Sequence, residues 1–140
     1  TVSAFEGDRQ YSFTHVLIRD AAYELLPRAR RRERHAQVAR FFEDATSEVG
    51  EATSALARHW RDAGEPGHAI RYFLAAGEQA ERGWAKEQAV ALYREALELV
   101  EDGDDEQRRK IRGKLAVARQ AHYHVLDARL LGRGETEAPA

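Results

Sequence analysis

The sequence predicts an all-α fold of antiparallel helices stacked in pairs, preceded by a short β-hairpin. Two observations carry the helical prediction: apolar residues recur at helical spacing in six segments, and glycine, proline or acidic breaks separate most of these segments. A third is a pattern of small and aromatic residues that recurs at a shift of twenty. The chain has 140 residues, of which 43% are hydrophobic and 33% charged. That size suits one domain whose apolar residues gather on helix faces.

The first 46 residues contain the predicted hairpin and two junction helices. Residues 1–14 hold two runs with apolar residues at alternate positions, joined by Gly7 and Asp8, which predicts a β-hairpin. Residues 15–46 change to a helical period. The first helix should span residues 15–26 and end before Pro27, and the second should run from Pro27 to about residue 46.

Residues 51–131 should form the helical array. A helix around Leu56 and Trp60 is closed by Gly64, and two strongly amphipathic helices follow at about 68–82 and 85–100. After an acidic loop at 101–106, a sixth helix runs through Ile111 toward Leu130. Residues 132–140 have almost nothing to bury, which predicts a disordered tail.

The internal repeat links these helices. Seven positions of one window recur, twenty residues later, as small or apolar residues: Leu56, Ala57, Trp60, Ala69, Ile70, Phe73 and Ala76 become Ala76, Gly77, Ala80, Ala89, Val90, Tyr93 and Ala96. Each window resembles a tetratricopeptide repeat, most clearly in residues 83–99, GWAKEQAVALYREALEL. A tetratricopeptide unit has about 34 residues, however, and Glu101 stands where its terminal proline is expected. We therefore predict that the helix at 68–82 packs against both the preceding and the following helix.

A second resemblance concerns the junction. Residues 11–43 read YSFTHVLIRDAAYELLPRARRRERHAQVARFFE. This stretch resembles a junction in large bacterial signal-transduction ATPases, including ATPase-linked adenylate cyclases and large LuxR-type transcriptional regulators. The resemblance implies an ATPase module, a winged-helix domain whose last part is the hairpin at 1–14, and then a tetratricopeptide-like array. A start at Thr1 without any methionine is typical of a processed or excised chain.

Composition and motifs disfavour catalysis and cofactors. The chain has no cysteine, no glycine-rich phosphate loop followed by Lys-Ser or Lys-Thr, and no apolar stretch of roughly 20 residues, so we expect a cytoplasmic protein without a membrane span. His122 and His124 are two apart on a helix and point to different faces, which argues against a metal site. We interpret His15 and His35 as structural histidines that cap or fill the core, and His59 as a partly exposed helix residue. The expectation is no enzyme, no metal and no cofactor.

Two sets of charged residues are candidate binding sites. If the first helix of each pair lines a concave face, a mixed-charge groove suited to a peptide or partner helix is formed by Arg58, Arg61, Arg71, Glu78 and Glu81. The other set could contact an anionic partner or phosphates: Arg28, Arg30, Arg31, Arg32 and Arg34. Basic helical faces are more often solvated and paired with nearby glutamates, and packing within the junction is the favoured role of this run.

The sequence thus predicts a non-catalytic protein-interaction and signal-relay module of a larger regulatory ATPase, cyclase or transcriptional regulator. Its partner would be a protein, a peptide or another domain of the parent chain, and homo-oligomerisation stays open. The alternative is a nucleic-acid contact module that uses the hairpin and the arginine run. A net charge of -2 and the absence of interleaved aromatic residues disfavour nucleic acid. A small apolar ligand between helices is neither supported nor excluded.

Overall fold

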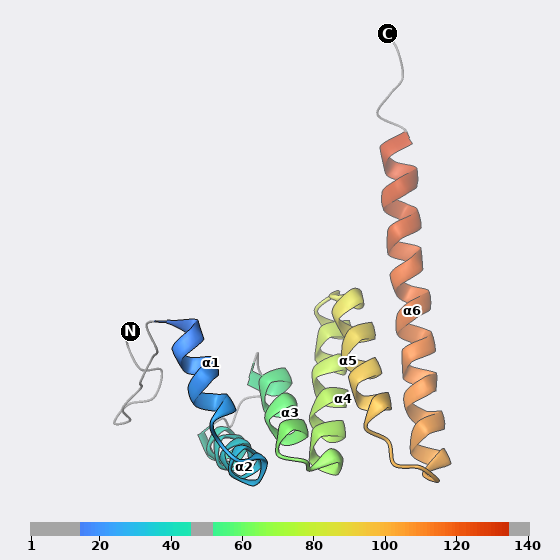
Figure 1. Ribbon diagram of the computed structural model, residues 1–140. Helices are drawn as coiled ribbons and strands as arrows, with labels where there is room; N and C mark the ends of the chain where they lie inside the picture. The colour runs from blue at the N-terminus through green and yellow to red at the C-terminus, as the bar shows by residue number, and fades with distance from the viewer. Residues whose placement is uncertain (1–14, 46–51, 135–140) are drawn as a thin grey trace.

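The structure is a computed structural model that describes residues 15–45 and 52–134, and within these residues the regular elements are all helices. The predicted hairpin at 1–14 and residues 135–140 lie outside the described residues. The described residues form six helices, labelled in Figure 1: α1 (Val16–Glu24), α2 (Arg28–Ala45), α3 (Ala52–Asp62), α4 (Pro66–Arg82), α5 (Lys86–Glu98) and α6 (Asp105–Gly134). The all-α prediction is confirmed for this part of the chain.

From α2 onward, each helix packs against the next one along the chain (Figure 1). The helix α4 therefore lies between α3 and α5, as the shift of twenty residues predicted. Two helices differ from the rest. The helix α1 at the N-terminal end contributes no buried residue, and α6 extends beyond the ends of α4 and α5. The result is a row of helices in which the core lies between successive neighbours.

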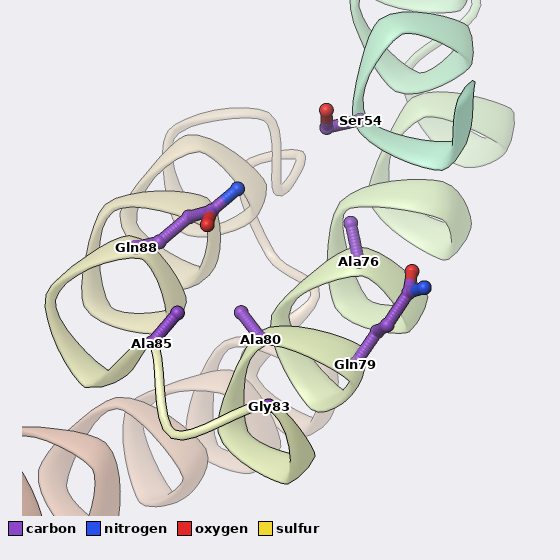
Figure 2. A pocket seen from close by; sticks show the side chains of 7 residues that line it. All are labelled: Ser54, Ala76, Gln79, Ala80, Gly83, Ala85 and Gln88. Atoms are coloured by element: carbon purple, nitrogen blue, oxygen red, sulfur yellow. The ribbon is translucent and has the colours of Figure 1, made fainter. Parts of the chain in front are cut away.

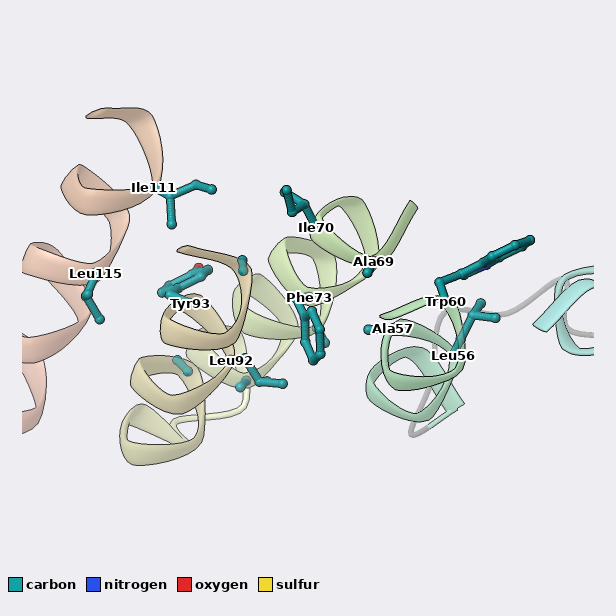
Figure 3. Packing of buried hydrophobic residues seen from close by; sticks show 14 of the residues in the cluster. Leu56, Ala57, Trp60, Ala69, Ile70, Phe73, Leu92, Tyr93, Ile111 and Leu115 are labelled. Carbon is teal, nitrogen blue, oxygen red and sulfur yellow. The ribbon is translucent and has the colours of Figure 1, made fainter. Parts of the chain in front are cut away.

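The residues of the predicted repeat form most of this core. Every position of both windows is buried, from Leu56 and Trp60 on α3 to Ala96 on α5. In Figure 3, the small Ala57 and Ala69 lie where α3 and α4 come together, while Phe73 of α4 and Tyr93 of α5 reach between helices. Fully burying one such side chain contributes roughly 1.5–3 kcal/mol. The small residues let the helix axes approach, and the aromatic residues fill the remaining space.

The turn between α3 and α4 closes with a motif that ends many helices. Gly64 has a left-handed backbone with a φ of 79°. Its N–H donates to the Arg61 carbonyl at 2.9 Å, and the Glu65 N–H donates to the Trp60 carbonyl at 3.0 Å. These two bonds define a Schellman motif, which satisfies carbonyl groups that the helix leaves unpaired. Glycine takes the left-handed position without steric cost.

The turn between α4 and α5 repeats this motif twenty residues later, but with a tryptophan at the left-handed position. Trp84 has a φ of 63°, and its N–H donates to the Glu81 carbonyl at 3.1 Å. The Ala85 N–H donates to the Ala80 carbonyl at 2.9 Å. The shift of twenty residues therefore relates whole helix–turn units as well as buried side chains. A left-handed tryptophan is strained, because its Cβ lies close to backbone atoms.

Three predictions about the ends of helices need correction. The helix α6 begins at Asp105, inside the predicted acidic loop, because the Asp104 carboxylate accepts a hydrogen bond from the Gln107 N–H at 3.1 Å and caps the first turn. It also continues to Gly134, three residues into the segment predicted as a tail. His15 was predicted to cap or fill the core, and this is wrong. It precedes α1, is exposed, and its side chain makes no capping hydrogen bond.

Candidate functional site

A groove of about 420 Å³ opens between α3, α4 and α5 (Figure 2). Its walls come from α3 and α5, represented by Ser54 and Gln88, and its floor comes from the small residues of α4 and the following turn. The lining residues are Ser54, Ala76, Gln79, Ala80, Gly83, Ala85 and Gln88. None of them is charged. Short side chains leave room on the floor, while hydroxyl and amide groups at the sides can both donate and accept hydrogen bonds.

An ion pair joins the two walls of this groove farther along the helices. Arg61 of α3 contacts Glu95 of α5 at 2.8 Å. Ser54, Arg58 and Arg61 are spaced i, i+4 and i+7, so they lie on one face of α3, and Gln88 and Glu95 are likewise seven residues apart on α5. The exposed Arg58 therefore lies between the uncharged groove and the ion pair. This face combines a neutral pocket with adjacent charges.

The structure does not bring the five predicted groove residues onto one surface. Arg58 and Arg61 lie beside the groove, but the three residues of α4 point to three different neighbours. The contacts are Arg71 with Glu43 of α2 at 3.7 Å, Glu78 with Lys114 of α6 at 2.8 Å, and Glu81 with the Tyr93 hydroxyl of α5 at 2.8 Å. Because α4 is the floor of the groove rather than one of its walls, its charged residues face other helices.

Glu43 links three helices, and the sequence alone did not predict this role. Its Oε1 atom accepts hydrogen bonds from the Trp60 indole at 3.0 Å and from the Tyr72 hydroxyl at 2.7 Å. One carboxylate thereby ties α2 to both α3 and α4. Burial and the hydrogen bond to Glu43 raise the pKa of Tyr72 above its ordinary value. A buried indole N–H needs such a partner, and this need is the signal that could have indicated a nearby acceptor.

The arginine run lies largely within intramolecular contacts. Arg31 donates to the carbonyls of Leu26 at 2.8 Å and Glu24 at 3.1 Å, so it caps the C-terminal end of α1. Arg32 donates to the Ala63 carbonyl at 3.3 Å, at the end of α3. Two more members pair locally, Arg30 with Glu33 at 3.5 Å and Arg34 with Gln37 at 3.3 Å, while Arg28 is exposed. The structure places the run where it supports the junction between helices.

A chain of hydrogen bonds connects the first three helices. The Tyr23 hydroxyl of α1 lies 3.0 Å from Nε2 of His35 on α2, and Nδ1 of His35 lies 3.1 Å from Nδ1 of His59 on α3. Phe42 stacks on the His59 ring at 6.1 Å between centroids. Burial and the neighbouring His35 lower the pKa of His59 below 6.5, although Asp62 opposes this shift. The prediction of a structural role for His35 is confirmed, whereas its pairing with His59 could not be seen without the packing of α2 on α3.

A second groove, of about 480 Å³, lies between the start of α5 and the C-terminal half of α6. Trp84, whose side chain is 80% exposed, lies at one side, and Leu126 and His122 of α6 contribute to the other. His124 is exposed rather than part of this lining, which agrees with the prediction that the two histidines lie on different faces. In residues 15–45 and 52–134, no three histidine, aspartate or glutamate side chains are grouped so that they could hold a metal ion.

Comparison with known proteins gives no relative: no protein-family model, curated protein or solved structure matches the chain. Within the described part of the chain, no helix combines the length and the apolar character required to cross a membrane. The function must therefore be argued from the geometry of the helices and their grooves.

Proposed function

We propose that this chain is a non-catalytic protein-interaction module and that it binds a peptide segment of its partner in the groove between α3 and α5. The observation that carries the proposal is the groove itself. Its floor of small side chains leaves the space unfilled, and its sides offer the Ser54 hydroxyl and the Gln88 amide, which suit the main-chain N–H and C=O groups of a peptide. Buried packing on both sides of α4 makes the walls a preformed scaffold.

The nucleic-acid alternative is less well supported by the contacts. Four of the five arginines in the run bond to carbonyl, carboxylate or amide groups of the chain itself. Phosphate binding would have to compete with these contacts, and Arg31 and Arg32 would lose the role of satisfying the ends of α1 and α3. Peptide binding in the groove between α3 and α5 requires no loss of these arginine contacts.

We further propose that the module relays partner binding to an attached regulatory ATPase, cyclase or transcriptional regulator. This part rests on the residue pattern at 11–43. Because the buried residues are shared between successive helices, a peptide wedged between α3 and α5 would also act on the junction helix α2 through α3. Such a coupling would give the array a relay role as well as a binding role.

The binding proposal can be tested with a peptide selected by phage display against the full chain. Its affinity should be measured by calorimetry for the wild type, for Ser54→Arg and for Gln120→Arg. The first substitution places a long side chain in the groove, and the second introduces the same side chain on an exposed site of α6. We expect at least tenfold weaker binding for Ser54→Arg, which corresponds to about 1.4 kcal/mol, and unchanged binding for Gln120→Arg.

Circular dichroism should show that both variants fold. Equal affinity of Ser54→Arg and wild type would refute the groove as the binding site. Failure to enrich any peptide above background would refute peptide binding as the function.

A further inference from the structure

The hydrogen-bonded chain of Tyr23, His35 and His59 is a titratable cluster that the proposed binding role leaves unused. It joins three helices through two short contacts, 3.0 Å between Tyr23 and His35 and 3.1 Å between the two Nδ1 atoms. Both histidines are half-buried, and the ring centroids lie 5.3 Å apart. Among the described residues, α1 contributes no buried side chain to the core.

We propose that these three side chains form a proton-sensitive latch that holds α1 and α2 on α3 and opens when both imidazoles become protonated. The latch concerns the junction helices and is independent of the peptide groove.

The number of hydrogen-bond donors on the two rings decides whether the contact can form. Two Nδ1 atoms at 3.1 Å can bond only if one carries a proton and the other accepts it. With both rings neutral, Tyr23 can donate to Nε2 of His35, whose Nδ1–H then donates to His59. One additional proton can also be accommodated, because a charged His35 still donates to a neutral His59. A second additional proton leaves two N–H groups and two positive rings facing each other, so the contact must break.

The charged surroundings give the latch little to offset that repulsion. On α3, Asp62 is the carboxylate that favours a proton on His59. On the α1 side, the Glu24 carboxylate is bonded to Arg31, whose guanidinium lies 4.9 Å from the centre of the Tyr23 ring. From α2, His35 faces His59, and Arg32 donates to the Ala63 carbonyl at the end of α3. The carboxylate that opposes the repulsion between the two rings is therefore Asp62, which also pairs with Arg61 at 3.1 Å.

Acid should therefore loosen the junction. The pKa of His59 is lowered in the folded chain, so between that value and 6.5 the open chain binds a proton that the closed latch excludes. Stability from this contact is fully present above pH 6.5 and is lost as the pH falls below it. The bonds from Arg31 to the carbonyls of Leu26 and Glu24 do not involve the two histidines and can persist when the latch is open.

The test is the pH dependence of unfolding in urea for the wild type, for His59→Asn and for His124→Asn. The asparagine side chain places an amide near the position of Nδ1 but does not titrate. His124 is an exposed histidine on α6, so its substitution makes the same change of side chain without touching the latch. For the wild type and for His124→Asn, we expect the equilibrium constant of unfolding to rise between pH 7 and 5.5, by up to tenfold per pH unit for one linked proton. For His59→Asn, the rise should be clearly smaller. An equal rise in all three proteins would overturn the proposal.

A second measurement uses the wild type alone and decides the matter if His59→Asn does not fold. Nitrogen NMR of ¹⁵N-labelled histidine reports which ring nitrogens carry protons. Near pH 7.5, one Nδ1 of the pair should be protonated and the other not. As the pH is lowered, the loss of the remaining unprotonated Nδ1 of the pair should coincide with changes in the amide signals of α1 to α3. Two fully protonated rings with unchanged amide signals would contradict the latch.

Discussion

The left-handed backbone of Trp84 leads to a prediction that reverses the usual order of alanine and glycine. In a helix interior, glycine is about 1 kcal/mol less stable than alanine. At Trp84, where φ is 63°, a residue with a Cβ instead carries roughly 1–2 kcal/mol of strain. Glycine removes this strain, but the conformational freedom that it loses on folding costs about 0.5–1 kcal/mol of stability. We therefore expect Trp84→Gly to be about 1 kcal/mol more stable than Trp84→Ala.

Comparing the two variants isolates the backbone effect, because both lose the same side chain. That side chain is 80% exposed and contacts Lys86 with a distance of 5.4 Å from Nζ to the ring centre, so its own contribution cancels in the difference. The free energy of unfolding should be measured by urea denaturation with circular dichroism, since Trp84 fluorescence is absent in both variants. Ala91→Gly on the exposed side of α5 serves as the control and should lose about 1 kcal/mol. If Trp84→Ala proves the more stable of the two, the left-handed turn is wrong.

Two further predictions concern the contacts within the array. A Cβ at Gly77 would meet the ring of Tyr93, so Gly77→Ala should lower the free energy of unfolding by about 1–3 kcal/mol. Gly113 has open space around it, so Gly113→Ala should raise the free energy of unfolding by about 0.5–1 kcal/mol. Urea denaturation of both variants measures these changes, and equal effects would contradict the close packing of α4 on α5. Glu43→Ala should cost about 1–3 kcal/mol, because it leaves the Trp60 indole and the Tyr72 hydroxyl without their acceptor. If Glu43→Ala lowers the free energy of unfolding no more than Asp44→Ala, at the exposed neighbouring position, then Glu43 does not link α2 to α3 and α4.

The sequence was sufficient to predict the helices and most of their core. Helical spacing placed Leu56, Phe73 and Tyr93 in the core, and all are buried. The shift of twenty residues corresponds to one helix and one turn, which is why it correctly predicted that α4 contacts both α3 and α5. Local capping was harder to predict. Gly83 is the residue that a sequence pattern favours for the left-handed position, yet its φ is -82° and Trp84 takes that position instead.

The candidate site was less predictable because it depends on which face of each helix meets which neighbour. The charged residues of α4 seemed to belong to one concave surface, but Glu78 contacts α6 and Arg71 contacts α2. The residues that line the groove include no charged or aromatic side chain that would mark them in the sequence as a binding site. Its lining becomes visible only when Ser54 and Gln88, 34 positions apart, are placed on facing helices (Figure 2). The pairing of His35 with His59 likewise depends on the packing of α2 against α3.

The proposed function depends on a partner peptide occupying the groove between α3 and α5. The most direct measurement is an NMR titration of the ¹⁵N-labelled chain with the selected peptide, followed through the amide signals. We expect the largest changes at residues that line the groove, Ser54, Gln79, Ala80 and Gln88, and little change at Arg109 and Arg112 on α6. Changes concentrated on α6 or on the arginine run of α2, with the groove signals unmoved, would contradict the claim.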